Sequence, residues 1–202
     1  MADTTNRKAT IMGIATRKAE EVIHLKVTLR GIRPPIWRRL EVPTRLSLGG
    51  LHDAIQAAMG WGGHHLYVFD VAGRSYGDPA RVDDAADDER LTVGGVLKAG
   101  VKRFTYTYDF GDDWEHEIVI EGRKAAVGGR RYPACTAGKR NCPPEDCGGV
   151  WWYRDLLAAL ADPSRCEAHE RSEWMDMDFD PEQFSVEMVD ARIAARLKSQ
   201  PA

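Results

Sequence analysis

The sequence has no long apolar run, few cysteines and no excess of positive charge. Its apolar stretches, such as Leu156–Ala161, are far shorter than the ~20 residues that a membrane-spanning helix requires. Its first residues are polar and lack the apolar core of a secretory signal, so we expect a cytoplasmic protein with no membrane association. The formal net charge of −3 argues against a surface built wholly for nucleic acid. Hydrophobic residues nevertheless make up 43% of the chain, which is enough for a buried core.

Hydrophobic alternation and helical periodicity predict an α+β fold with a mixed or antiparallel sheet. We expect a flexible tail at 1–19 and a single domain at 20–198, with a helix after the first hairpin and helices at the C-terminal end. Expected strands are 22–29, 36–42, 65–71, 101–110 and 114–122. Expected helices are 47–59, begun by the N-cap Ser47, then 91–98, 151–161, and 181–197 with Asp180 as its N-cap. Residues 128–150 are rich in Gly, Pro and Cys, and we expect a long ordered loop there.

Four segments carry a resemblance to a known family. Together they resemble the plasmid pRiA4b ORF-3-like family, whose members occur on plasmids and insertion sequences. The resemblance spans roughly residues 20–195 and implies a compact α+β fold with no established activity. The segments are VTLRGIRPPIWRRL at 27–40, GWGGHHLYVF at 60–69, YTYDFGDDWEH at 106–116 and CPPEDCGG at 142–149.

Some members of that family carry a transposon-resolvase label, but resolvase activity is not expected here. A serine recombinase needs an activated serine among clustered arginines, followed by a basic helix-turn-helix module. Ser47 and Ser75 are the serines of the N-terminal half; the first is expected to cap a helix and the second to lie in a turn. The C-terminal part is acidic, so it does not suit a DNA-binding module.

Carboxylates and histidines gather in three motifs and suggest a metal-dependent hydrolase, with nucleic acid as a candidate substrate. In the expected hairpin, four carboxylates and an imidazole lie within eight residues (Asp109, Asp112, Asp113, Glu115 and His116), which suits general acid–base work or a divalent cation. Strand alternation predicts that His116 faces the core, so the alternative is an Asp-rich turn in which Asp109 bonds its own backbone. A convergence of His64, His116 and Asp109 would require the sheet to bring them together. The catalytic candidates are His64, Asp109, Asp112, His116, Glu145 and Asp146.

The cysteines form a second candidate site. In a reducing compartment a disulfide framework is not expected, which leaves free thiols or zinc ligands. Cys135, Cys142 and Cys147 fall within thirteen residues of the expected loop, where a structural zinc would offset the entropy of ordering the chain. Cys166, His169 or His116 would supply the fourth ligand.

The charge distribution suggests a third site. Residues 1–50 contain ten Lys and Arg but four Asp and Glu. Arg33, Arg38 and Arg39 flank Trp37 and could dock nucleic acid, although a solvated basic strand is the alternative. The leading hypothesis is an accessory or interaction module that binds an unknown protein partner and holds a structural zinc. The family resemblance associates this module with plasmids or mobile elements. The hydrolase and a nucleic-acid-docking regulator are the alternatives.

Overall fold

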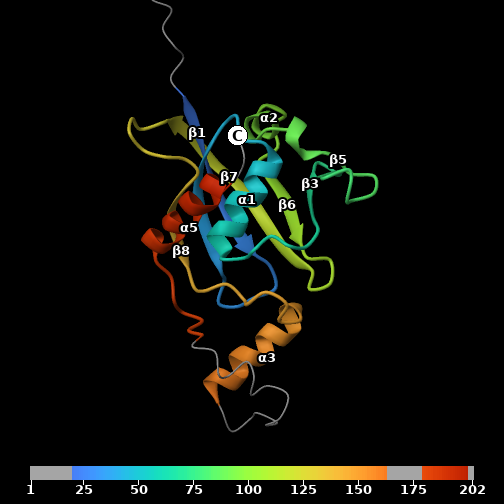
Figure 1. The fold of residues 1–202 in the computed structure, drawn as a ribbon, viewed down its shortest axis with the longest axis vertical. Helices are drawn as coiled ribbons and strands as arrows, with labels where there is room; N and C mark the ends of the chain where they lie inside the picture. The colour runs from blue at the N-terminus through green and yellow to red at the C-terminus, as the bar shows by residue number, and fades with distance from the viewer. Residues whose placement is uncertain (1–19, 163–178, 200–202) are drawn as a thin grey trace, which may run out of the picture.

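The computed structural model describes residues 20–162 and 179–199, which are built on an eight-stranded sheet (Figure 1). The spatial strand order is β5-β4-β3-β6-β7-β1-β2-β8, and neighbours are antiparallel except β4 and β5. The predicted α+β class with a mixed sheet is therefore confirmed, whereas the expected tail at 1–19 lies outside the described residues. The strands are β1 Glu21–Leu29, β2 Trp37–Pro43, β3 Tyr67–Val71, β4 Arg74–Gly77, β5 Ala86–Asp87, β6 Arg103–Tyr108, β7 Trp114–Ala125 and β8 Ala134–Lys139. The helices are α1 Leu48–Met59, the 3-10 turn η1 Asp88–Arg90, α2 Val93–Lys98, α3 Gly149–Ala161 and α5 Val186–Ser199.

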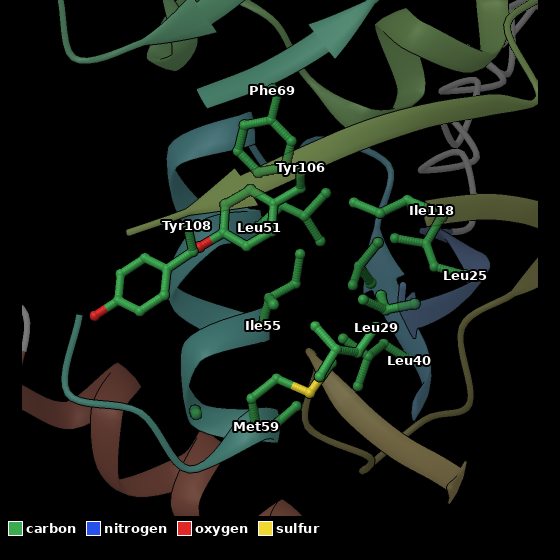
Figure 2. Packing of buried hydrophobic residues seen from close by; sticks show 14 of the residues in the cluster. Leu25, Leu29, Leu40, Leu51, Ile55, Met59, Phe69, Tyr106, Tyr108 and Ile118 are labelled. Carbon is green, nitrogen blue, oxygen red and sulfur yellow. The ribbon is translucent and has the colours of Figure 1, made fainter. Parts of the chain in front are cut away.

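Helix α1 follows the first hairpin and covers the core face of the sheet. The Ser47 side chain accepts a hydrogen bond from the Gly50 amide, which satisfies a free donor at the helix start. Gly60 ends the helix at φ +91°, a left-handed conformation that glycine adopts without strain. The apolar face of α1 packs onto buried side chains from several strands (Figure 2). The predicted helix and both of its ends are confirmed.

The opposite face of the sheet carries paired charges. Arg39 of β2 donates two hydrogen bonds to Glu121 of β7, at 2.8 and 3.0 Å. Arg103 of β6 bonds Glu117 at 2.5 Å. Alternation along each strand therefore separates an apolar core face from a charged outer face, as the sequence pattern predicts.

Two predictions about the C-terminal half are wrong. The last helix begins at Val186, where the Ser185 hydroxyl accepts from the Met188 amide. It does not begin at Pro181, because the Pro181 carbonyl accepts from Asn141 and the chain there forms a turn. The expected loop at 128–150 also contains β8, which pairs with the open edge of β2.

Strand β8 was hidden because its small residues, Ala, Thr and Gly, show no alternation of apolar and polar side chains. Strand β3 also starts later than predicted, at Tyr67, so His65 lies in the connection that precedes it. Among the described residues, no helix combines the length and apolarity needed to cross a bilayer.

Candidate metal centre

The segment 142–149 is hydrogen-bonded to two other parts of the chain, the residues after α1 and the end of β6. The Trp61 indole donates to the Pro143 carbonyl at 2.8 Å. Glu145 then bridges both sides: its carboxylate accepts from the Gly62 amide at 2.7 Å and from the Tyr108 hydroxyl at 2.6 Å. These contacts hold the segment against the end of β6.

A further bond ties the same segment to the β6–β7 turn. The Gly148 amide donates to the Asp112 carboxylate at 3.1 Å. Gly149 packs so closely that a Cβ there would lie 2.6 Å from the Asp112 carbonyl oxygen, at a backbone φ of +77°. Only glycine fits this approach, so the two turns and the start of α3 form one packed junction.

Three potential metal ligands meet at this junction: His65, Asp109 and Asp146. One ligand atom from each lies within 4.8 Å of the other two. The His65 Nε2 atom is 2.9 Å from Asp146 Oδ1, and its Nδ1 atom is 3.8 Å from Asp109 Oδ2. These two contacts involve opposite nitrogens of the ring, and only one nitrogen can bind a given ion. The case for a metal therefore rests on the set of three ligand atoms that lie within 4.8 Å of one another.

The three side chains differ in their exposure to solvent, which determines whether water can reach the cluster. The Asp109 side chain is 12% exposed and that of His65 33%, whereas Asp146 is 71% exposed. The His65 ring also lies edge-on to Tyr108, with 5.8 Å between ring centroids, which fixes its orientation. The cluster is thus anchored on one side and open to solvent on the other.

The backbone explains why both carboxylates are aspartates. Asp109 and Asp146 adopt φ values of +58° and +57°, in the left-handed region that Asp tolerates better than most residues. The Asp109 Oδ1 atom accepts from the Gly111 amide at 2.9 Å, so the turn holds this side chain while Oδ2 faces His65. The expected bonding of Asp109 to its own turn is confirmed, and it coexists with a role in the cluster.

The expected convergence of His64, His116 and Asp109 does not occur. His64 is exposed beside Gly62, and its neighbour His65 takes the inward position. The sequence does not single out His65, because the alternating pattern of 65–71 places it at the start of an expected strand. The motif Gly62-Gly63-His64-His65 contained the signal, since a glycine pair leaves either imidazole free to face the site.

His116 lies in the core, as the alternation predicts. Its Nδ1 atom is 3.3 Å from the Tyr106 carbonyl, and its ring lies edge-on to Trp61. Burial lowers the pKa of His116 to about 4, so the imidazole is neutral at pH 7. Within the part of the chain that the structure describes, its Nε2 atom has no hydrogen-bond partner. His116 therefore belongs to the packing beneath the junction and takes no part in the ligand cluster.

The remaining carboxylate candidates support the junction. Both oxygens of Glu145 accept hydrogen bonds, and Asp112 accepts from Gly148, so these two side chains hold the segment that carries Asp146. Of the six catalytic candidates, Asp109 and Asp146 are thus the two whose carboxylates face a common point with His65.

The three described cysteines do not form a ligand group of three among the described residues. Cys142 is buried between Met59 and Arg38, with its sulfur 3.1 Å from each side chain. Burial raises the pKa of Cys135 to about 11 and of Cys147 to about 12, so both are protonated thiols in this fold. The other two predicted ligands, Cys166 and His169, lie outside the described residues, so the zinc prediction for this set stays a prediction.

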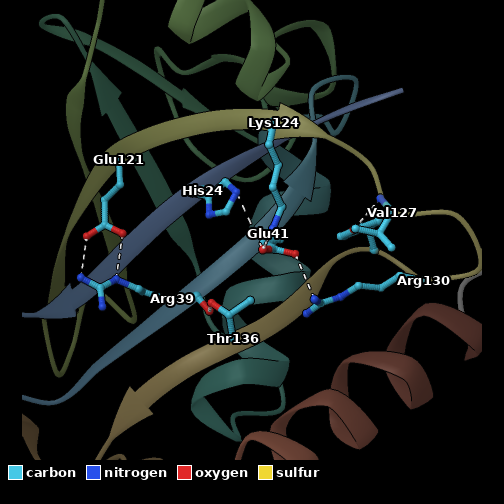
Figure 3. Close-up of polar contacts among 9 residues, drawn as sticks. His24, Arg39, Glu41, Glu121, Lys124, Val127, Arg130 and Thr136 are labelled. Atoms are coloured by element: carbon cyan, nitrogen blue, oxygen red, sulfur yellow. Dashed lines mark hydrogen bonds and ion pairs between the residues drawn. The ribbon is translucent and has the colours of Figure 1, made fainter. Parts of the chain in front are cut away.

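The basic residues of the first hairpin are separated by the fold. Arg38 is buried and donates to the Ala58 and Lys139 carbonyls, so its guanidinium does not reach the surface. Arg39 faces solvent but is paired with Glu121 (Figure 3). Of the three predicted nucleic-acid contacts, Arg33 is exposed with no ion pair among the described residues. Glutamates of β7 thus offset the positive charge of this hairpin.

A cavity of about 850 Å³ lies elsewhere, between the start of β1, helix α2 and β7. Its lining includes Glu20, Arg45 and Lys98 but no predicted site residue. The ligand geometry at His65, and not a cavity, therefore identifies the candidate site.

Comparison with known proteins gives consistent matches. A family model described as plasmid pRiA4b ORF-3-like protein matches residues 21–188. The chain is 42% identical over 156 residues to the uncharacterized protein y4hQ of Sinorhizobium fredii, covering 76% of this chain and 80% of that protein. It is also similar to the crystal structure of a protein of unknown function from Methanosarcina mazei Go1. That similarity has a TM-score of 0.75 and 36% identity, and covers 84% of this chain and 97% of the other.

Proposed function

The chain belongs to the plasmid pRiA4b ORF-3-like family, and we propose that it is a metal-dependent hydrolase whose ion is bound by His65, Asp109 and Asp146. The observation that carries this proposal is the meeting of three ligand atoms within 4.8 Å, from three separate segments of the chain. The similar proteins have no stated activity, so the function is argued from this site alone.

The ligand types favour a transition-metal ion. An imidazole with two carboxylates suits Zn²⁺ or Mn²⁺, whereas Mg²⁺ and Ca²⁺ prefer oxygen ligands alone. The zinc expected from the sequence would then bind here instead of among the cysteines.

The number of ligands favours catalysis over a structural role. Structural zinc sites have four protein ligands, whereas catalytic sites have three and keep one position for water. Asp146 is 71% exposed, so the fourth position faces solvent. A zinc ion held by these three residues would supply a coordinated water of lowered pKa, as a nucleophile toward a carbonyl or phosphoryl centre.

Isothermal titration with ZnCl₂ and MnCl₂ tests the site. We expect about one ion per chain, with affinity reduced at least tenfold in His65→Gln and Asp146→Ala. His64→Gln is the matched control because it alters the adjacent, exposed histidine and should bind metal normally. Metal retained in His65→Gln but lost in Cys142→Ser would move the ion to the cysteine set and overturn the proposal.

Hydrolysis is tested separately with chromogenic ester, peptide anilide and phosphodiester substrates in the presence of the bound metal. Activity should require the metal and disappear in Asp146→Ala, while the circular dichroism spectrum stays unchanged. Metal binding without turnover of any of the three substrate classes would remove the hydrolase assignment and leave a metal-binding protein.

A further inference from the structure

Three large aromatic side chains are exposed on the two segments that adjoin the candidate metal centre, the β6–β7 turn and the start of α3. Phe110, Trp151 and Trp152 are 49%, 78% and 52% exposed, and we call them the aromatic rim. Phe110 follows the ligand Asp109 directly, and the tryptophans lie in the first turn of α3. Large exposed aromatic side chains are costly to hydrate, and when grouped they mark interaction sites.

The packed junction holds the two segments that carry the aromatic rim next to each other. The Trp152 indole lies against Gly148, whose amide bonds the Asp112 side chain of the turn that contains Phe110. The β6–β7 turn and the start of α3 are therefore held as neighbours, and both are visible at the lower end of the sheet in Figure 1.

The charge around the rim is negative. Asp112 and Asp113 lie in the turn, and Glu145 lies in the adjoining segment. A divalent ion would offset Asp109 and Asp146 but leave these three carboxylates. Among the nearby cations, Arg196 is paired with Asp53, whereas Arg154 donates to the neutral Gly31 carbonyl and keeps its positive charge. The three carboxylates still outnumber this one arginine.

We propose that the aromatic rim, with Asp112 and Asp113, docks a basic peptide segment of a partner protein. A Lys or Arg side chain would stack on a Trp face and direct its charge toward the turn carboxylates, combining cation–π attraction with charge pairing. The fold already contains this pairing on its outer face, where Lys26 and Arg39 each lie 5.3 Å from the Trp37 ring centroid. A nucleic acid would meet the same carboxylates with its phosphates and be repelled.

This inference rests partly on the proposed function. If the metal centre is hydrolytic, the docked segment is its substrate, which makes the substrate class a basic peptide. The docking itself rests on the rim and on its charge, and does not require the ion.

Fluorescence anisotropy with a labelled alternating Gly-Arg octapeptide tests the docking. We expect the double variant Trp151→Ala, Trp152→Ala to weaken binding by about tenfold or more, since each indole removed costs a cation–π contact. Asp113→Asn should weaken it several-fold. Both tryptophans are exposed, so the variants should fold, which thermal denaturation checks.

Matched control variants distinguish binding at the aromatic rim from non-specific attraction of the peptide to an acidic protein. Trp37→Ala removes an aromatic side chain from the outer sheet face, and Asp70→Asn removes an exposed carboxylate from β3; both should bind within twofold of the unaltered protein. Equal weakening by these controls, or tighter binding of a labelled oligothymidylate than of the peptide, would overturn the inference. Peptide binding by a protein that takes up no metal would overturn the proposed function and leave the docking surface standing.

Discussion

At the scale of single residues, buried polar side chains in this core are neutral or multiply paired. The Tyr106 hydroxyl receives a hydrogen bond from Gln56 at 2.9 Å and lies 2.7 Å from His52 Nδ1. Burial lowers the pKa of His52 to about 3, and that of His116 to about 4.

These two histidines predict acid sensitivity. Each has an unfolded pKa near 6.5 and a lower folded pKa, so the unfolded chain binds more protons below pH 6.5. The stability they contribute is complete above about pH 6.5 and decreases as pH falls toward 4. Each unit of pKa difference corresponds to about 1.4 kcal/mol.

Urea unfolding between pH 7 and pH 4 measures this dependence. His116→Gln has no imidazole to protonate and should show a shallower loss of stability than the unaltered chain. The exposed His64→Gln serves as the control, and its free energy of unfolding should decrease with pH as steeply as that of the unaltered chain. If the free energy of unfolding of His116→Gln decreases equally steeply, the lowered pKa of His116 does not contribute to acid sensitivity.

Glu41 predicts a second residue-scale effect. Its carboxylate is 3% exposed and lies 2.6 Å from Lys124 and 3.4 Å from Arg130, with His24 at 3.8 Å (Figure 3). Lys124→Met leaves a buried charge with fewer partners and should lower the free energy of unfolding by about 1–3 kcal/mol. Arg39→Met, which breaks an exposed pair on the same sheet face, should have little effect. Chemical denaturation measures the free energy of unfolding of both variants. Equal decreases would show that the burial of Glu41 does not determine how much its ion pair contributes to stability.

At the scale of elements, the connections determine the site more than the strands do. His65 precedes β3, Asp109 follows β6, and Asp146 precedes α3. None of the three lies within a helix or strand, so their positions depend on contacts between turns. One of these contacts is the close approach of Gly149 to the Asp112 carbonyl.

Gly149→Ala should therefore loosen the start of α3. The new Cβ would meet the Asp112 carbonyl at 2.6 Å, and a φ of +77° is strained for alanine, so we expect a loss of about 1–3 kcal/mol. Gly128→Ala is the matched control, because nothing lies within 4 Å of its Cβ position. Thermal denaturation compares them, together with amide exchange along α3. If both variants lose the same stability, the close approach is unimportant.

At the scale of the whole molecule, a bound ion would join parts of the chain that are distant in sequence. An ion that binds the folded chain alone stabilises it by about 2.7 kcal/mol at a concentration 100 times its dissociation constant. The melting temperature should therefore rise with added Zn²⁺ or Mn²⁺ and return with a chelator. Asp146→Ala should abolish the rise, whereas Asp70→Ala should not. A melting temperature that is independent of metal would argue against the site.

The sequence by itself determined the elements whose patterns are local. Alternation identified β1 and β2, the N-cap Ser47 and the closing Gly60 bounded α1, and the period of β7 placed His116 inside. These features depend on neighbours within a few residues, which a sequence displays directly.

Only the tertiary structure decided which histidine joins the carboxylates, that β8 completes the sheet, and that Arg38 is buried. His64 and His65 are adjacent and chemically identical, so the choice between them depends on Tyr108 and on a segment about 80 residues away. Strand β8 consists of small residues and exists because the edge of β2 needs hydrogen-bond partners. Such pairings depend on contacts between residues distant in the sequence, so they cannot be predicted from the spacing of neighbouring residues.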